Sequence, residues 1–140
     1  LDANNRVASA LGKGLFNLNY CNARIRAHKE RWVSYEARRN GSADSATYHY
    51  RASGPPRTAQ PGGLEFFLTE RYALYASSRD QRRLWRGLVH HPPYALHDAR
   101  LDRFSTLPVA WNGTGHVSGA PQHACVSPGV RVEVFPLEEI

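Results

Sequence analysis

His90 and His91 stand side by side in the sequence, directly before Pro92-Pro93. Proline cannot continue a central strand, so the two histidines end a strand. Successive strand residues face opposite sides of a sheet, and only one histidine can point inward. An inward histidine titrates near neutral pH, which makes His90 a candidate general acid or base. Hydrogen bonding at the strand end is the alternative role.

His123 and Cys125 form a second pair with suitable chemistry. They are two residues apart on an expected strand, so they share a face and could act together as metal ligands. No standard zinc spacing accompanies them. We therefore expect neither a metal nor another cofactor.

Cys21 and Cys125 are the two cysteines, and neither belongs to a CxxC pair. No secretory signal precedes them, which favours a reducing, cytoplasmic location. Cys21 would be a nucleophile if the charge of Arg24 favoured its thiolate form. A buried structural cysteine is the alternative.

The chain is basic, with 18 Lys and Arg residues against 12 Asp and Glu residues and a net charge of +6. The lysines are Lys13 and Lys29, and the arginines are spread along the sequence without a run of five. This spread argues against a nucleic-acid-binding protein and favours a solvated, arginine-rich surface. No apolar run approaches the roughly 18 residues of a membrane span.

A length of 140 residues favours one domain with its own core. Helices are expected over 2–11, with Asp2 as N-cap, and over 64–70. Residues 53–63 are expected to form a Pro/Gly-rich loop, and 105–121 remain open. Period-two patterns predict strands over 20–28, 31–39, 46–52, 83–91, 122–127 and 130–135. Residues 71–77 and 94–104 are weaker candidates. The segment 94–104 could pair back on 83–91.

The first three strands would form an antiparallel meander. Strands outnumber helices, so the fold class is mainly β (α+β), with a curved or closed antiparallel sheet and two or more short helices.

Two segments are similar in sequence to a known protein family: LEFFLTERYALY at 64–75 and LWRGLVHHPPYAL at 84–96. With LDA at 1–3 and LNYCNARI at 18–25, they resemble the uncharacterised YqjF-like family of the acetoacetate-decarboxylase-like superfamily. The resemblance runs through essentially the whole chain in the expected order. It implies a cone-shaped antiparallel sheet around a central ligand cavity.

The resemblance also implies a further segment upstream of Leu1. Residues 1–140 would then be the C-terminal part of a longer family domain. The sheet would have an open apolar edge that a missing segment, another chain or a rearrangement must cover.

Acetoacetate decarboxylase uses a lysine that forms a Schiff base, activated by an adjacent lysine. The resemblance places that lysine pair near residues 20–24, where this sequence has no lysine. Lys13 and Lys29 fall at a helix end and in a hairpin turn, where we expect them to be solvated. Schiff-base decarboxylation is therefore not expected.

If the implied cavity exists, Glu70 is a second candidate acid or base, in addition to His90. Arg71 or Arg86 would then anchor a carboxylate. A structural Glu–Arg pair is the alternative. Nearby aromatic residues would line the pocket. The expected ligand-binding residues are Tyr20, Arg24, Arg71, Tyr72 and Arg86.

These features favour a protein that binds a small carboxylate or keto compound, with or without turnover. The alternative is a structural or interaction module that a partner or a second copy completes, giving a homo-oligomer.

Overall fold

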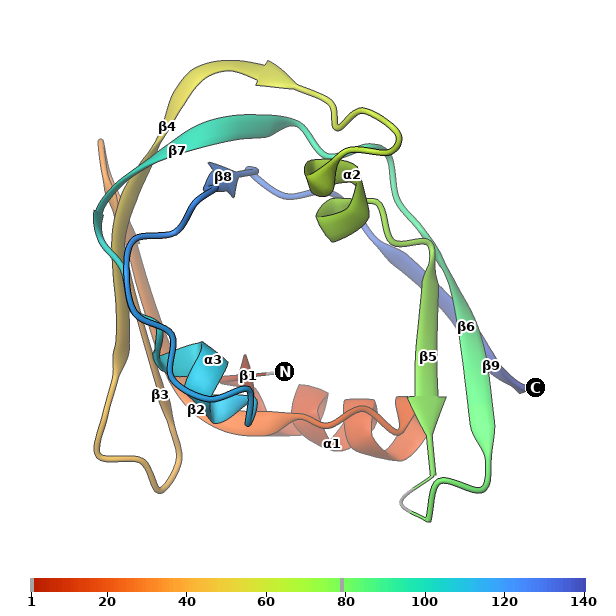
Figure 1. The fold of residues 1–140 in the computed structure, drawn as a ribbon. Helices are drawn as coiled ribbons and strands as arrows, with labels where there is room; N and C mark the ends of the chain where they lie inside the picture. The colour runs from red at the N-terminus through yellow and green to blue at the C-terminus, as the bar shows by residue number, and fades with distance from the viewer. Residues whose placement is uncertain (1, 79) are drawn as a thin grey trace.

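Two sheets form the wall of a strongly curled half-barrel in the computed structural model, which describes residues 2–78 and 80–140 (Figure 1). The larger sheet has the order β1 (Asp2–Ala3), β2 (Cys21–Lys29), β3 (Val33–Arg39), β4 (Ala46–Arg57), β7 (Leu96–Arg103) and β8 (Cys125–Val126). The smaller sheet has the order β5 (Ala73–Ser77), β6 (Leu84–His90) and β9 (Glu133–Glu139). The helices are α1 (Arg6–Phe16), α2 (Leu64–Thr69) and α3 (Leu107–Trp111).

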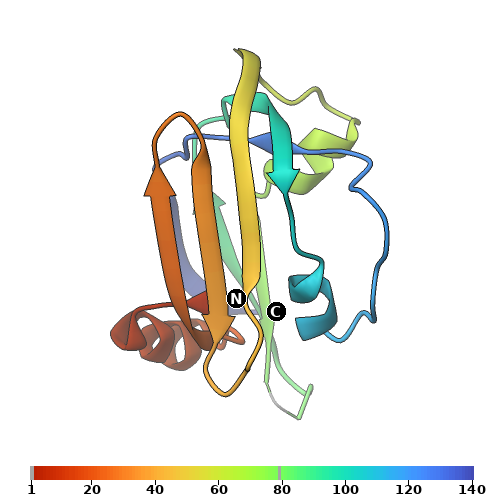
Figure 2. The same ribbon diagram turned by 90° about the vertical axis from the view of Figure 1, so that its left-hand side faces the viewer.

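The meander of β2, β3 and β4 is confirmed, and Figure 2 shows its three strands side by side. Its register places Ala27 opposite Tyr35 and Tyr35 opposite Tyr48. The Tyr48 hydroxyl donates to the Ser105 carbonyl oxygen at 2.9 Å, just before α3. Because α3 lies inside the curl (Figure 1), this apolar row faces inward and the intervening polar residues face outward.

Helix α1 begins later than the sequence predicted. Its N-cap is Asn5, whose side chain accepts hydrogen bonds from the Val7 and Ala8 amides, which satisfies two free donors of the first turn. Asp2, the expected N-cap, lies in β1 and forms an ion pair with Arg39 at 2.7 Å. The helix ends at Phe16, and its C-cap Asn17 has the left-handed conformation, with φ of 49°.

Strand β4 continues to Arg57, through residues expected to form a loop. Its last partner on β3 is Val33, opposite Tyr50, so Pro55 and Pro56 lie where β4 has β7 as its one neighbour. Proline is tolerated there because no second ladder needs its amide. Register shifts after His49 and Ser53 accompany the bend that curls the sheet.

The pairing expected for 94–104 was wrong. Strand β7 pairs with β4 and β8 instead of returning to β6, whose neighbours are β5 and β9. Pro92-Pro93 end β6 and lead the chain across to the other sheet, and the open segment 105–121 contains α3.

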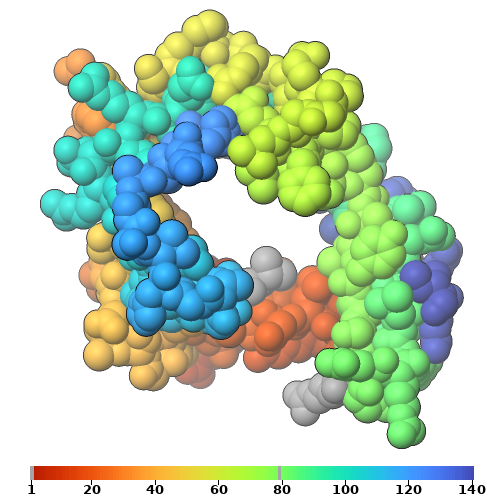
Figure 3. Space-filling model, in the orientation of Figure 1, coloured from red at the N-terminus to blue at the C-terminus, as the bar shows by residue number. Residues whose placement is uncertain are grey.

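The interior is not closed by side chains. The accessible surface is 10172 Å², whereas a compact protein of 15.7 kDa exposes about 7,300 Å². Figure 3 shows an opening through the molecule, bounded by α2, β5, α1 and the segment from α3 to β8. The described helices include none long and apolar enough to cross a membrane. The buried apolar residues among those described are Ala23, Ala37, Ala46, Ala59, Ala76 and Leu96.

Candidate functional site

Glu70 is buried at the end of α2, with 7% of its surface exposed. One carboxylate oxygen accepts a hydrogen bond from the Tyr72 hydroxyl at 2.5 Å, and the other accepts the Tyr94 amide at 3.2 Å. The Glu70 carboxylate thus connects the segment after α2, which carries Tyr72, with the segment after β6, which carries Tyr94. Arg71 points elsewhere, with its guanidinium 4.0 Å from the ring centre of Phe67.

The inward member of the histidine pair is His91, which is 5% exposed. Its ring stacks on Tyr72 with centroids 4.7 Å apart. Its Nδ1 lies 2.9 Å from the Pro92 carbonyl oxygen, and its Nε2 lies 3.3 Å from the Arg71 carbonyl oxygen. His90 is exposed and lies opposite Glu133 on β9.

The hydrogen bond to Glu70, together with desolvation and the carboxylate charge, raises the pKa of Tyr72 above its ordinary value. The carboxylate is an acceptor, so it favours the protonated hydroxyl. Glu70, Tyr72, His91 and Tyr94 form one cluster, held by the two hydrogen bonds to Glu70 and by the ring contacts of His91 with Tyr72 and Tyr94.

The remaining predicted residues lie apart from this cluster. Tyr20 packs over Gly12 of α1, and Arg24 lies opposite Arg38 on the outer face of the meander. Arg86 is exposed on β6, 3.9 Å from Glu138. The structure thus brings Glu70 and Tyr72 together and leaves Tyr20, Arg24, Arg86 and His90 in separate places.

A pocket of about 500 Å³ lies between the β2–β3 hairpin and β8. Its apolar wall uses inward-facing residues of the meander, among them Ala27, Val33 and Tyr50. The other lining residues are Lys29, Glu30, Arg31, Arg51, Ala52, His97, Val126, Ser127 and Pro128.

The rim of this pocket carries three cations and one carboxylate. That carboxylate, Glu30, already lies 2.9 Å from His28. Arg51 lies over the Trp32 ring at 4.9 Å. Lys29 and Arg31 have no carboxylate at ion-pair distance among the residues that the structure describes. The sequence did not predict this pocket, because Lys29 was expected to be solvated in a hairpin turn, although its charge was visible.

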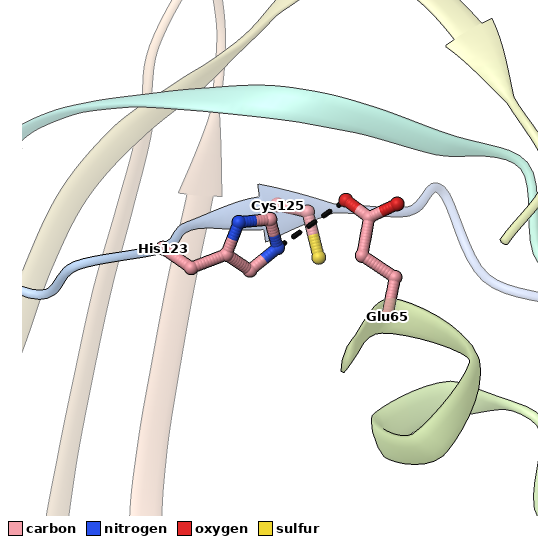
Figure 4. Close-up of side chains that lie close together, drawn as sticks. All are labelled: Glu65, His123 and Cys125. Atoms are coloured by element: carbon pink, nitrogen blue, oxygen red, sulfur yellow. Dashed lines mark ion pairs between the residues drawn. The ribbon is translucent and has the colours of Figure 1, made fainter. Parts of the chain in front are cut away.

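Glu65, His123 and Cys125 come together on the inner side of the curl (Figure 4). Glu65 lies in the first turn of α2, and the other two flank Ala124 at β8. His123 Nε2 is 3.2 Å from Glu65 Oε1, and one donor atom from each residue lies within 4.8 Å of the others.

Arg57 positions the Glu65 carboxylate. Its Nε donates to Oε2 at 3.3 Å and its Nη2 donates to Oε1. The same Nη2 lies 2.8 Å from Asp98 Oδ1. Burial, and then the Glu65 carboxylate, raise the pKa of the Cys125 thiol above its ordinary value, against a lowering by Arg57. The thiol is therefore a poor nucleophile at neutral pH.

Comparison with known proteins identifies relatives without a described activity. The chain is 32% identical over 104 residues to the uncharacterized protein YqjF of Bacillus subtilis (strain 168), a match that covers 73% of this chain and 42% of that protein. The chain thus spans less than half the length of this relative. No solved structure matches it significantly. Because residues 1–131 match the family DUF2071, described as an uncharacterized conserved protein, the chain belongs to that family.

Proposed function

We propose that this chain binds a small carboxylate or keto compound in the pocket between the β2–β3 hairpin and β8, on an acetoacetate-decarboxylase-like sheet. The observation that carries the proposal is the combination of an apolar wall with two cations, Lys29 and Arg31, that have no carboxylate at ion-pair distance among the described residues. The curled antiparallel sheet supports the superfamily placement in its coarse features.

The size and charge of the pocket suit such a ligand. Its volume of about 500 Å³ lies within the range of small-molecule sites. The apolar wall would bury the body of the ligand, and the cations at the rim would meet its carboxylate. An arginine can hold a carboxylate through two parallel hydrogen bonds, which favours Arg31 over Lys29 as the specific anchor.

Binding without Schiff-base chemistry fits the position of the lysines. Lys13 lies on α1 and does not line this pocket. Lys29 lines it but is exposed at the end of β2. No second lysine stands beside either one, so the arrangement that activates an amine in the decarboxylase is missing.

Thermal melting with pyruvate, acetoacetate and phenylacetate tests the proposal. Ligand at about 100 times Kd stabilises a protein by about 2.7 kcal/mol, so the melting midpoint should rise with at least one acid. The neutral amide of that acid should produce little shift. Arg31→Gln should reduce the affinity at least tenfold, whereas Arg86→Gln, an exposed arginine outside the pocket, should not. An unchanged midpoint with every acid, or equal binding by Arg31→Gln, would reject the proposal.

A second function is favoured by the exposed apolar stripe of α1. Val7, Leu11 and Leu15 recur every four residues and are 67%, 53% and 65% exposed. A soluble helix normally buries such a stripe. The adjacent groove of about 650 Å³ lies between the end of α1 and the smaller sheet, and is lined by Gly14, Leu15, Phe16, Asn17, Trp85, Val134, Pro136 and Leu137. An interaction module completed by a second copy or a partner would cover this surface.

Light scattering at micromolar concentration tests this alternative. The expected result is a mass of at least twice that of the chain. Leu11→Gln combined with Leu15→Gln should reduce that mass, whereas Lys13→Gln, an exposed residue of the same helix, should leave it unchanged. A wild-type monomer would argue against self-association.

A further inference from the structure

We propose that Glu65, His123 and Cys125 bind a divalent transition metal of the zinc class. The three side chains come from two elements that are distant in sequence, α2 and the β8 segment, and meet on the inner side of the curl (Figure 4). None of them lines the pocket at the β2–β3 hairpin, so this proposal does not depend on the proposed function.

The donor atoms are close to the spacing that a metal imposes. Bonds of about 2.0–2.3 Å in a tetrahedral zinc site separate neighbouring ligand atoms by about 3.3–3.6 Å. His123 Nε2 and Glu65 Oε1 are already 3.2 Å apart. The Cys125 sulfur lies within 4.8 Å of the other donors, so a closure of roughly 1 Å completes the site.

The chemistry of the three donors selects the metal. Thiolate and imidazole suit Zn²⁺ and Co²⁺, whereas Mg²⁺ and Ca²⁺ require oxygen ligands. A divalent ion would neutralise the Cys125 thiolate and the Glu65 carboxylate. Arg57 forms ion pairs with both Glu65 and Asp98, so its single positive charge offsets one of these two carboxylates. The charges therefore balance once the ion is bound.

The surrounding structure holds the donors in place. The Ala99 amide donates to the Ala124 carbonyl oxygen at 3.0 Å, which fixes the backbone between His123 and Cys125. Arg57 holds both oxygens of the Glu65 carboxylate, with Nε on Oε2 and Nη2 on Oε1, and in this position Oε1 lies 3.2 Å from His123 Nε2. Such second contacts orient metal ligands. Three protein ligands leave a fourth position for water or a small ligand.

A nucleophilic Cys–His–Glu triad fits the geometry less well. In a triad the two ring nitrogens of histidine serve different groups, one facing the nucleophile and one the carboxylate. Here Nε2 faces Glu65, and Figure 4 shows the Cys125 sulfur on the same side of the ring. Donors that converge on one point are the arrangement of a metal site.

Cobalt titration of the untagged, chelator-treated chain tests the site. One equivalent of Co²⁺ should produce near-ultraviolet thiolate-to-cobalt absorption, and Zn²⁺ should displace it. Cys125→Ser should abolish that absorption, and His123→Gln should weaken binding at least about tenfold. Cys21→Ser, at the other cysteine, and His90→Gln, at an exposed histidine, are the matched controls and should bind as the wild type does.

Alkylation of the wild-type chain keeps the test decisive if a variant fails to fold. Zn²⁺ should slow iodoacetamide modification of Cys125 at least tenfold and leave Cys21 unchanged, as peptide mass spectrometry would show. Equal alkylation rates with and without Zn²⁺, or a cobalt spectrum without thiolate absorption, would overturn the proposal.

Discussion

The Tyr72 hydroxyl donates a 2.5 Å hydrogen bond to the carboxylate of Glu70, two residues earlier in the chain. The other oxygen of the same carboxylate accepts the amide of Tyr94, beyond the end of β6. Glu70 therefore joins the exit of α2 to the crossing between the two sheets. This is the place where the Pro92-Pro93 segment leads the chain from β6 to β7.

Glu70→Ala should lower the free energy of unfolding by about 1–3 kcal/mol, because it removes a buried carboxylate and leaves the half-buried Tyr94 amide without its acceptor. Urea unfolding measures the change. Glu138→Gln, at an exposed carboxylate on β9, is the control and should remain within about 0.5 kcal/mol of the wild type. If Glu70→Ala proves as stable as the control, the carboxylate does not hold the crossing.

Titration of Tyr72 should depend on Glu70. A raised pKa means that the folded state favours the protonated hydroxyl. The resulting stability is present below the unfolded tyrosine pKa of about 10 and is lost as pH rises through the folded value. Glu70→Gln should bring the pKa of Tyr72 down toward its ordinary value. Ultraviolet difference titrations measure this pKa, with the wild type compared with Tyr72→Phe, and Glu70→Gln compared with the same chain carrying Tyr72→Phe as well. If the two Tyr72 titration curves coincide, the pKa of Tyr72 does not depend on Glu70.

Acid sensitivity should depend on the ion pair between Arg83 and Glu139. The hydrogen bond from Arg83 holds the pKa of the Glu139 carboxyl below its ordinary value. Its stabilisation is present above the unfolded pKa of about 4.3 and is lost as pH falls through the folded value. Arg83→Gln should return that pKa to the ordinary range, as carboxyl NMR would detect. Added salt should weaken the effect because the pair is exposed.

Gly12 and Gly14 should respond oppositely to alanine, although both lie in α1. A Cβ at Gly12 would lie 2.2 Å from Tyr20 Cε2, whereas nothing lies within 4 Å of a Cβ at Gly14. We expect Gly12→Ala to destabilise the fold by about 1–3 kcal/mol through overpacking. Gly14→Ala should stabilise it by about 0.5–1 kcal/mol, because alanine favours the helix. Thermal unfolding compares them, and an equal effect of the two substitutions would exclude a close contact with Tyr20.

Alternation alone predicted the meander, because each strand there pairs with its neighbour in sequence. It also predicted that His123 and Cys125 share a face. The family resemblance through LEFFLTERYALY and LWRGLVHHPPYAL is supported by the match to DUF2071. The strands of the meander and the shared face of His123 and Cys125 depend on residues close together in sequence, so the sequence pattern predicts them directly.

Long-range packing decided the rest. The crossing of β7 to β4 places β8 beside Asp98 and so brings His123 and Cys125 to Glu65, a residue that the sequence offered no reason to join to them. Likewise, Lys29 and Arg31 border a pocket because β8 lies near the β2–β3 hairpin. The alternation of residues in a strand specifies which face is apolar, but it does not specify which distant strand covers that face. The curl of the sheet and the pairing of its strands make that choice.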